Sequence, residues 1–136
     1  MPRPDPRVIT AIARTPMGGE QGVLSPFSAR QLGAVAIKTA VERSGLKPAD
    51  VEDVIMGNCL PAGQGQAPAR QAARGAGLPD STGALTINKM CGSGMKAIML
   101  AHDLIKAGTN TVMVAGGMES MTNAPYLLPK AIRGYR

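Results

Sequence analysis

The clearest fold signal lies in residues 84–117, which read ALTINKMCGSGMKAIMLAHDLIKAGTNTVMVAGG. Residues 84–88 form a short apolar run of the kind that makes a buried strand. A helix is expected over about residues 91–107, because apolar side chains recur there at helical spacing and a glycine follows at the usual place for a helix end. Residues 111–115 are again apolar and partly β-branched. The stretch therefore predicts strand, helix and strand in succession.

The rest of the chain continues this alternation. Residues 8–13 predict a first buried strand, and residues 54–56 predict a second. Between them, a capping-box pattern and a closing glycine indicate a helix within residues 28–45. Another helix is expected over about residues 67–76, with a proline in its first turn. Apolar strands that alternate with helices predict the α/β class, with a mostly parallel sheet and helices on both faces.

The helix expected after Cys91 carries apolar residues around almost its whole circumference. Its charged groups are Lys96, Asp103 and Lys106. Such a helix needs cover on nearly every side, and a single sheet covers only one of them. We therefore expect a second layer, from another domain or subunit, on its other side.

Composition narrows the function classes. The 136 residues suffice for one domain with a core, and hydrophobic residues make up 44% of them. The net charge is +6, but the basic residues are scattered and aromatic residues make up only 2%, so nucleic-acid binding is not expected. The sequence has no apolar stretch of membrane-spanning length and no apolar N-terminal signal. A soluble, cytoplasmic protein is the expectation.

Cys91 is the candidate nucleophile, because it follows a strand and opens a helix in a turn with Gly92, Ser93 and Gly94. Backbone N–H groups at a helix start stabilise negative charge by about 0.3–1 kcal/mol, which favours a thiolate. The glycines remove side chains, so that a bulky thioester can approach the sulfur and a backbone N–H can reach the developing oxyanion. These three residues are therefore predicted to line the substrate approach. The alternative is that Cys91 is an inert, buried thiol.

Other reactive residue types receive structural interpretations. Cys59 lies at a strand end without a glycine turn, and it is expected to be structural. His102, the only histidine, cannot be the base for Cys91, since eleven helical residues at about 1.5 Å each separate the two by about 16 Å. Glu119 follows the last strand at the sheet edge where the Cys91 turn begins. It is either catalytic or a polar anchor for the loop after that strand, and the anchor is the favoured interpretation. The methionines around Cys91 are expected to fill the core, and no metal site is expected.

Several motifs in one order resemble the thiolase family, particularly its acetyl-CoA acetyltransferases. They are residues 14–16 (RTP), 57–58 (GN), 65–72 (GQAPARQA), 88–94 (NKMCGSG) and 116–121 (GGMESM). The resemblance implies that the chain is the N-terminal part of such an enzyme. Residues 1–122 would be an incomplete N-terminal α/β domain, and residues 123–136 would begin the coenzyme A-binding loop region. The fold would be one half of a five-layered αβαβα sandwich.

The resemblance also implies a chemistry. Cys91 would attack an acyl-CoA to give an acyl-enzyme, with its backbone N–H helping to hold the oxyanion, and a second acetyl-CoA would accept the acyl group. The catalytic histidine, a second cysteine and most of the coenzyme A loop would lie outside these residues, so the chain alone is expected to be inactive or nearly so. The family pattern further implies no tightly bound cofactor, a homodimer or homotetramer, and a role in fatty acid metabolism.

Two other functions remain open on the sequence. Residues 92–97 fit the G-x-G-x-x-A pattern of a dinucleotide-binding module between a strand and a helix, although that pattern normally sits at the first strand of its unit. The chain is alternatively a non-catalytic half-subunit that dimerises through its apolar helix.

Overall fold

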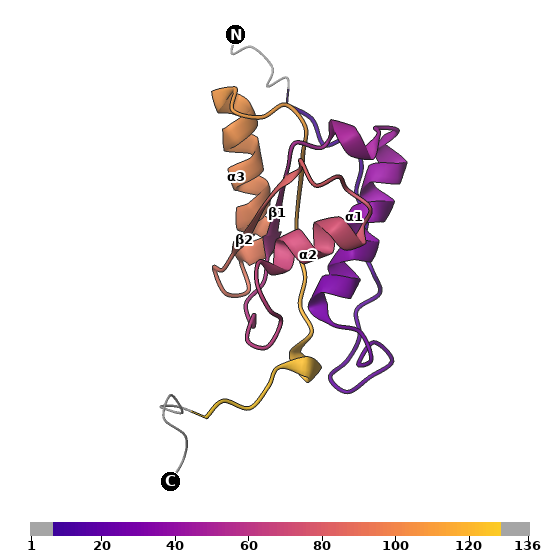
Figure 1. The fold of residues 1–136 in the computed structure, drawn as a ribbon, viewed down its shortest axis with the longest axis vertical. Helices are drawn as coiled ribbons and strands as arrows, with labels where there is room; N and C mark the ends of the chain where they lie inside the picture. Colours follow the sequence, from indigo (N-terminus) through magenta and orange to yellow (C-terminus); the bar gives the residue numbers. More distant parts are fainter. Residues whose placement is uncertain (1–6, 129–136) are drawn as a thin grey trace.

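A three-stranded parallel sheet lies at the centre of the chain in a computed structural model that describes residues 7–128 (Figure 1). The strands are β1 (Asp53–Gly57), β2 (Gly83–Ile87) and β3 (Met113–Gly117), in the order β2-β1-β3. Gly57 pairs with both Ile87 and Gly117. The carboxyl ends of the three strands therefore meet at one edge of the sheet, and the loops that follow them lie together.

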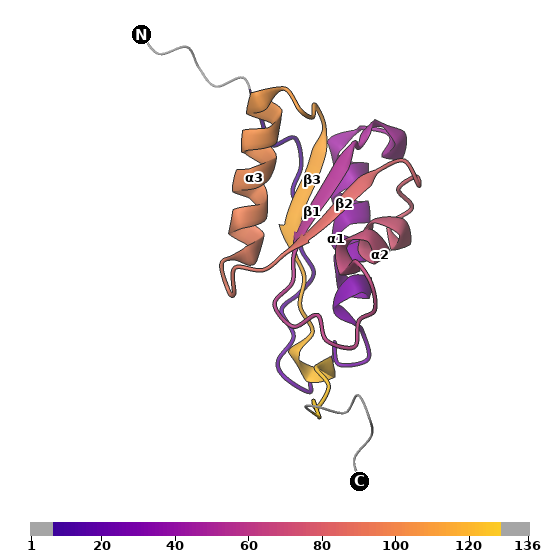
Figure 2. The same ribbon diagram turned by 60° about the vertical axis from the view of Figure 1, so that its left-hand side comes forward.

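Helices cover both faces of the sheet. Helix α1 (Ala29–Ser44) and helix α2 (Pro68–Gly75) lie on one face, and α3 (Ser93–Ala107) lies on the other (Figure 2). The connection β1-α2-β2 crosses the sheet in one direction and β2-α3-β3 returns past β1, so right-handed crossovers place α2 and α3 on opposite faces. Short 3₁₀ helices, η1 (Pro48–Asp50) and η2 (Met121–Asn123), complete the elements. The predicted α/β class with helices on both faces is confirmed.

The helix ends follow from the local sequence. At the start of α1, the Ser28 backbone N–H donates to Gln31 Oε1 at 2.8 Å, and Gly45 ends the helix with a positive φ of 74°. Pro68 occupies the first position of α2, where its missing N–H costs no helical hydrogen bond. Both helices match the residues predicted for them to within one or two positions.

The core consists of small aliphatic and methionine side chains, as the scarcity of aromatic residues requires. Between the sheet and the α1–α2 layer, the buried side chains include Ile37, Val54, Met56, Ala72 and Met118. On the opposite face, α3 contributes the buried Ala97 and Ala101. No helix in residues 7–128 combines the length and the apolar character needed to cross a membrane.

The strand predicted at residues 8–13 is wrong. The segment belongs to no sheet, and Val8, Ile9 and Ile12 are 76%, 73% and 77% exposed. Only the small side chains of Ala11 and Ala13 are half-buried, and the Arg43 guanidinium donates to the Ile12 carbonyl at 2.9 Å. An apolar run predicts burial, but burial also requires a partner.

Two further expectations need correction. The last strand is shifted by two residues relative to 111–115, because Gly116 and Gly117 pair within the sheet. Among the methionines, Met118 is buried as predicted. Met90, Met95, Met99 and Met121 are exposed, so the core-filling role is wrong for them.

The outer face of α3 is uncovered in residues 7–128. Met95, Ile98 and Met99 all lie on it and are exposed. The sequence predicted this need for cover, since the sheet buries only the Ala97 and Ala101 side. The second layer itself stays a prediction.

Candidate active site around Cys91

Cys91 lies in the turn between β2 and α3, at the carboxyl edge of the sheet. Its thiol is exposed and free. Gly92 is the N-cap of α3, so Cys91 stands one residue before the cap instead of opening the helix. Within residues 7–128, Cys91 is therefore not the buried thiol of the alternative interpretation. An exposed thiol at this edge is accessible to a substrate, because ligands of open α/β folds bind there.

The turn uses some of the helix-start donors itself. The Gly92 N–H donates to the Lys89 carbonyl at 3.1 Å, and the Ser93 N–H donates to the Met90 carbonyl at 3.0 Å. These two N–H groups stabilise the turn, so their charge effect at the thiol is smaller than the sequence argument assumed. Met90 adopts a φ of 47°, in the left-handed region. For a non-glycine residue this costs on the order of 1 kcal/mol and is frequent at functional sites.

Ser93 and Gly94 hold the turn against the sheet. The buried Ser93 hydroxyl accepts the Lys89 N–H at 2.8 Å and donates to the Met90 carbonyl. A Cβ on Gly117 would lie 3.2 Å from Gly94 Cα, so the absent side chain of Gly117 lets α3 approach β3 closely at Gly94. The structure thus assigns both residues a packing role. The substrate-binding role predicted for Gly92, Ser93 and Gly94 stays a prediction.

Cys59 contacts the same turn. Its half-buried thiol donates to the Met90 carbonyl at 2.8 Å and lies 3.5 Å from the Ser93 hydroxyl. The Cys59 carbonyl also accepts the Asn88 side-chain amide at 3.2 Å. A structural role agrees with these contacts. The sequence did not predict that Cys59 contacts the Cys91 turn. This contact arises because β1 and β2 are neighbours in the sheet, so the loops that follow them lie side by side.

Glu119 is a polar anchor, as predicted, and the loop that it holds is the one after β1. Its Oε2 accepts the Cys59 N–H at 2.7 Å, and its Oε1 accepts the Leu60 N–H at 3.2 Å and the Asn58 side-chain amide at 2.7 Å. Glu119 follows β3, so its carboxylate ties the loops at the ends of β3 and β1 together. Three N–H donors on one carboxylate make a strong, directional contact.

His102 is remote from Cys91, as the helix geometry predicts. It lies in the continuous helix α3, where its Nδ1 is 3.2 Å from Asp103 Oδ1. Within residues 7–128, no three His, Cys, Asp or Glu side chains are grouped to hold a metal ion.

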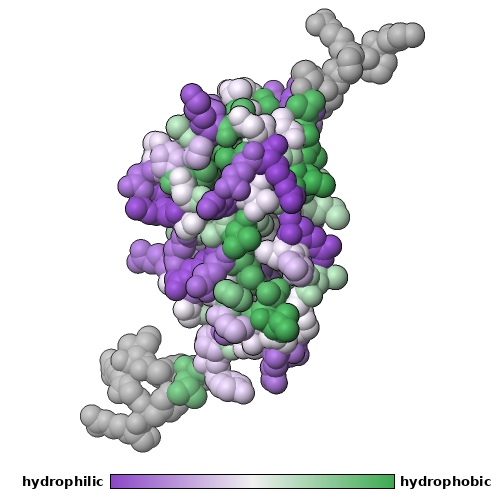
Figure 3. All heavy atoms as spheres, turned by 90° about the vertical axis from the view of Figure 1, so that its right-hand side faces the viewer, coloured by the Kyte–Doolittle hydropathy of each residue, from purple (hydrophilic) through white to green (hydrophobic). Residues whose placement is uncertain are grey.

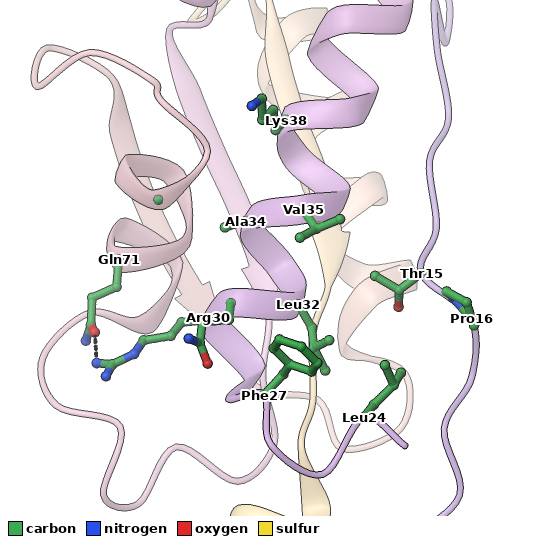
Figure 4. A pocket seen from close by; sticks show the side chains of 12 residues that line it. Thr15, Pro16, Leu24, Phe27, Arg30, Leu32, Ala34, Val35, Lys38 and Gln71 are labelled. Atoms are coloured by element: carbon green, nitrogen blue, oxygen red, sulfur yellow. Dashed lines mark hydrogen bonds between the residues drawn. The ribbon is translucent and has the colours of Figure 1, made fainter. Parts of the chain in front are cut away.

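A hollow on the α1 side of the molecule does not include Cys91. It measures about 670 Å³ and lies between α1 and the N-terminal segment, with Pro16, Leu24, Phe27 and Leu32 in its lining (Figure 4). On this side, apolar side chains gather between hydrophilic ones (Figure 3). Arg30 donates to Gln71 across one end. The chemistry-bearing residues lie elsewhere, so this hollow is no candidate for the acyl-transfer site.

Known proteins resemble the chain over almost its whole length. The family described as "Thiolase, N-terminal domain" matches residues 7–136. A mitochondrial acetyl-CoA acetyltransferase of Xenopus laevis is 56% identical over 128 residues, covering 94% of this chain and 30% of the relative. A cytosolic acetyl-CoA acetyltransferase of Gibberella zeae is 54% identical, covering 95% and 33%.

A solved structure agrees. The Acat5 thiolase of Ascaris suum, in complex with coenzyme A, superposes with a TM-score of 0.88 at 40% identity, covering 94% of this chain and 34% of that chain. The present chain therefore spans about a third of the length of these relatives. With the parallel sheet, the Cys91 turn and these matches in agreement, the chain belongs to the thiolase family and corresponds to its N-terminal domain.

Proposed function

We propose that Cys91 is the nucleophile of an acetyl-CoA C-acetyltransferase, which transfers an acetyl or acyl group between coenzyme A thioesters. The single observation that carries the proposal is an exposed cysteine in a strained turn at the carboxyl edge of the sheet, where the thiolase motifs at residues 57–58, 88–94 and 116–121 meet. Strain and exposure together are typical of a reactive position and not of a packing one.

The proposed reaction has two steps. The Cys91 thiolate attacks the thioester carbonyl carbon, a new carbon–sulfur bond forms, and the coenzyme A thiolate leaves. The Cys91 backbone N–H helps to hold the oxyanion of the tetrahedral intermediate. In the second step, the α-carbon of another acetyl-CoA, after losing a proton, attacks the acyl-cysteine carbonyl and releases the Cys91 sulfur. The base that takes each proton lies outside this chain, since His102 is out of reach.

The proposed enzyme also needs catalytic groups that these 136 residues do not supply. The relatives are about three times longer, and we propose that the rest of the protein supplies the histidine, the second cysteine and most of the coenzyme A clamp. It would also supply the second half of the αβαβα sandwich, whose natural contact is the exposed apolar face of α3. The division at residue 122, with a coenzyme A loop beginning at residue 123, belongs to this proposal; residues 129–136 of that loop lie outside the described part.

Several features of the whole protein follow from the same proposal. Acyl-CoA and acetyl-CoA are its substrates, without a tightly bound cofactor, and the complete protein is a homodimer or homotetramer. The proposal also includes a cytoplasmic location and a role in fatty acid metabolism for the complete protein. Relatives named mitochondrial and cytosolic both occur, and the cytosolic one supports this location.

Thiolysis tests the proposed function. The complete protein, given acetoacetyl-CoA and free coenzyme A, is expected to form acetyl-CoA, and Cys91→Ala is expected to abolish the reaction. Titration with NAD tests the dinucleotide-binding alternative, which the acetyltransferase relatives do not favour. Tight NAD binding together with full thiolysis by Cys91→Ala would overturn the proposal.

A further inference from the structure

We propose that Glu119 is a positioning residue for Cys91: its carboxylate fixes the loop Asn58–Leu60, and this loop orients the peptide group that carries the Cys91 N–H. The inference rests on the function proposed above, since it concerns the oxyanion donor of that reaction. Glu119 itself touches neither the sulfur nor the substrate in this account.

The first link is the carboxylate of Glu119. Its two oxygens accept hydrogen bonds from three donors: the Cys59 and Leu60 backbone N–H groups and the Asn58 side-chain amide, at 2.7, 3.2 and 2.7 Å. An ionised carboxylate only accepts, so every one of these contacts is of matched polarity. Consecutive backbone groups held by one side chain leave the loop little freedom to rotate.

The second link is the orientation of Asn58. Its Nδ2 donates to Glu119 Oε1 and, at 3.3 Å, to the Met118 carbonyl. The side chain is 1% exposed, yet its Oδ1 has no hydrogen-bond partner in the described residues. Flipping the amide would place Oδ1 against the Glu119 carboxylate, which is worse than an unpaired acceptor. The hydrogen bond to Glu119 therefore keeps the Asn58 amide in an orientation that leaves its Oδ1 without a partner.

The third link runs from this loop to the turn. The Cys59 carbonyl accepts the Asn88 side-chain amide at 3.2 Å, and Asn88 Oδ1 accepts the Met90 N–H at 2.9 Å. The Cys59 thiol donates to the Met90 carbonyl at 2.8 Å. The Met90 N–H is thus held by a side chain that contacts the loop, and its carbonyl accepts the Cys59 thiol of the loop together with the Ser93 N–H and hydroxyl. Met90 is also the residue with a φ of 47°.

The last link is the planarity of the peptide bond. The Met90 carbonyl and the Cys91 N–H belong to the same peptide group and point in opposite directions, because that group is planar and trans. Fixing the carbonyl consequently fixes the direction of the Cys91 N–H. In the proposed reaction this N–H serves the oxyanion, which exists only near the transition state, so misdirecting it lowers kcat more than it raises KM.

The test is Glu119→Gln in the complete protein. Glutamine has nearly the same shape, but its NH₂ group must face either the Cys59 N–H or the Asn58 and Leu60 donors. We expect kcat for thiolysis to fall roughly tenfold or more, with KM changed by less than about twofold. Glu42→Gln is the matched control, since Glu42 is an exposed residue of α1 that pairs with Lys38. It is expected to leave both constants unchanged.

A second readout separates positioning from folding. Alkylation of Cys91 by iodoacetamide needs the thiolate but no oxyanion donor, so its rate is expected to stay near that of the unsubstituted protein in Glu119→Gln. A folded Glu119→Gln protein with unchanged kcat would overturn the inference. A parallel loss of melting temperature, alkylation rate and kcat would also overturn it, by showing general disruption.

Asn88→Ala provides an independent variant if Glu119→Gln fails to fold. It removes the link between the Cys59 carbonyl and the Met90 N–H, and we expect the same fall in kcat with little change in KM. In the double variant the two losses are expected to be less than additive, because both act through one loop. Wild-type kcat in folded Asn88→Ala, or full additivity, contradicts the inference. Failure of the proposed function is seen separately, as the absence of an acyl-Cys91 in the unsubstituted protein.

Discussion

The thiol of Cys59 lies 2.8 Å from the carbonyl oxygen of Met90, the residue directly before Cys91. The Ser93 N–H and the Ser93 hydroxyl donate to the same oxygen. The two cysteines of the chain therefore meet at one peptide group: Cys59 contacts its carbonyl, and Cys91, the proposed nucleophile, contributes its N–H. This arrangement makes the environment of Met90 a sensitive point of the site.

Substitution of Cys59 is expected to affect the reaction through that contact. Cys59→Val removes the donor to the Met90 carbonyl, and a net hydrogen-bond contribution of about 0.5–1.5 kcal/mol corresponds to roughly a two- to tenfold fall in kcat. Cys59→Ser keeps a donor and is expected to lose less. Steady-state kinetics of the two variants in the complete protein measures the effect. Indistinguishable kcat values for Cys59→Val and Cys59→Ser would show that the hydrogen bond to the Met90 carbonyl does not contribute to the reaction.

Gly57 is expected to tolerate no side chain. A Cβ there would lie 2.5 Å from Ser93 Cβ and 2.6 Å from the Ser93 carbonyl carbon, so α3 would have to move off the sheet. Overpacking of this kind destabilises by about 1–3 kcal/mol, which urea unfolding of Gly57→Ala in the complete protein measures. Gly19→Ala is the control, because no atom lies within 4 Å of its added Cβ and its stability change should stay within about 0.5 kcal/mol. Equal stabilities for the two variants would refute the close approach.

The outer face of α3 gives a test of the second layer. Ile98 is 48% exposed, so Ile98→Glu should be nearly neutral if nothing else covers this face. In the complete protein we expect a loss of stability on the order of several kcal/mol, because an unpaired carboxylate would be buried against the second layer. Differential scanning calorimetry measures it, with the exposed Lys106→Gln as control. An unchanged melting temperature in Ile98→Glu argues that α3 stays open to solvent.

The 136-residue chain by itself is expected to be inactive or nearly so. In the proposed function Cys91 is the nucleophile, while the base and most of the coenzyme A clamp lie in the rest of the protein, and both are needed for transfer. Coenzyme A release from acetoacetyl-CoA, measured side by side for this chain and for the complete protein, checks the expectation. A comparable rate per Cys91 would show that the described residues already hold a complete site.

The sequence predicted those elements whose stability is local. The caps at Ser28 and Gly45, the proline at Pro68 and the apolar runs of β1 and β2 all lie where pattern and turn chemistry indicate. The strand prediction for residues 8–13 was wrong because an apolar run indicates that the side chains favour burial but does not indicate which element would cover them. The shift of β3 arose because two glycines, which normally mark a strand end, lie inside β3, where Gly117 makes the close contact with Gly94 of α3.

The site was predictable only in part for a related reason. Cys91 and the anchoring role of Glu119 follow from their positions after strands at one sheet edge. The contact between Cys59 and Met90 depends on β1 lying next to β2, which the order of elements along the chain does not determine. The Gly92 and Ser93 N–H groups donate to the Lys89 and Met90 carbonyls. These hydrogen bonds likewise depend on the conformation of the turn, which the sequence pattern did not predict.

Mapping of the acyl adduct tests the central claim most directly. The complete protein is incubated with acetyl-CoA, digested under mildly acidic conditions that preserve thioesters, and analysed by tandem mass spectrometry. The account predicts an acetyl group on Cys91, none on Cys59, and no adduct on either position in Cys91→Ala. An acetyl group carried by any other residue of the catalytically active protein, with Cys91 unmodified, would contradict it.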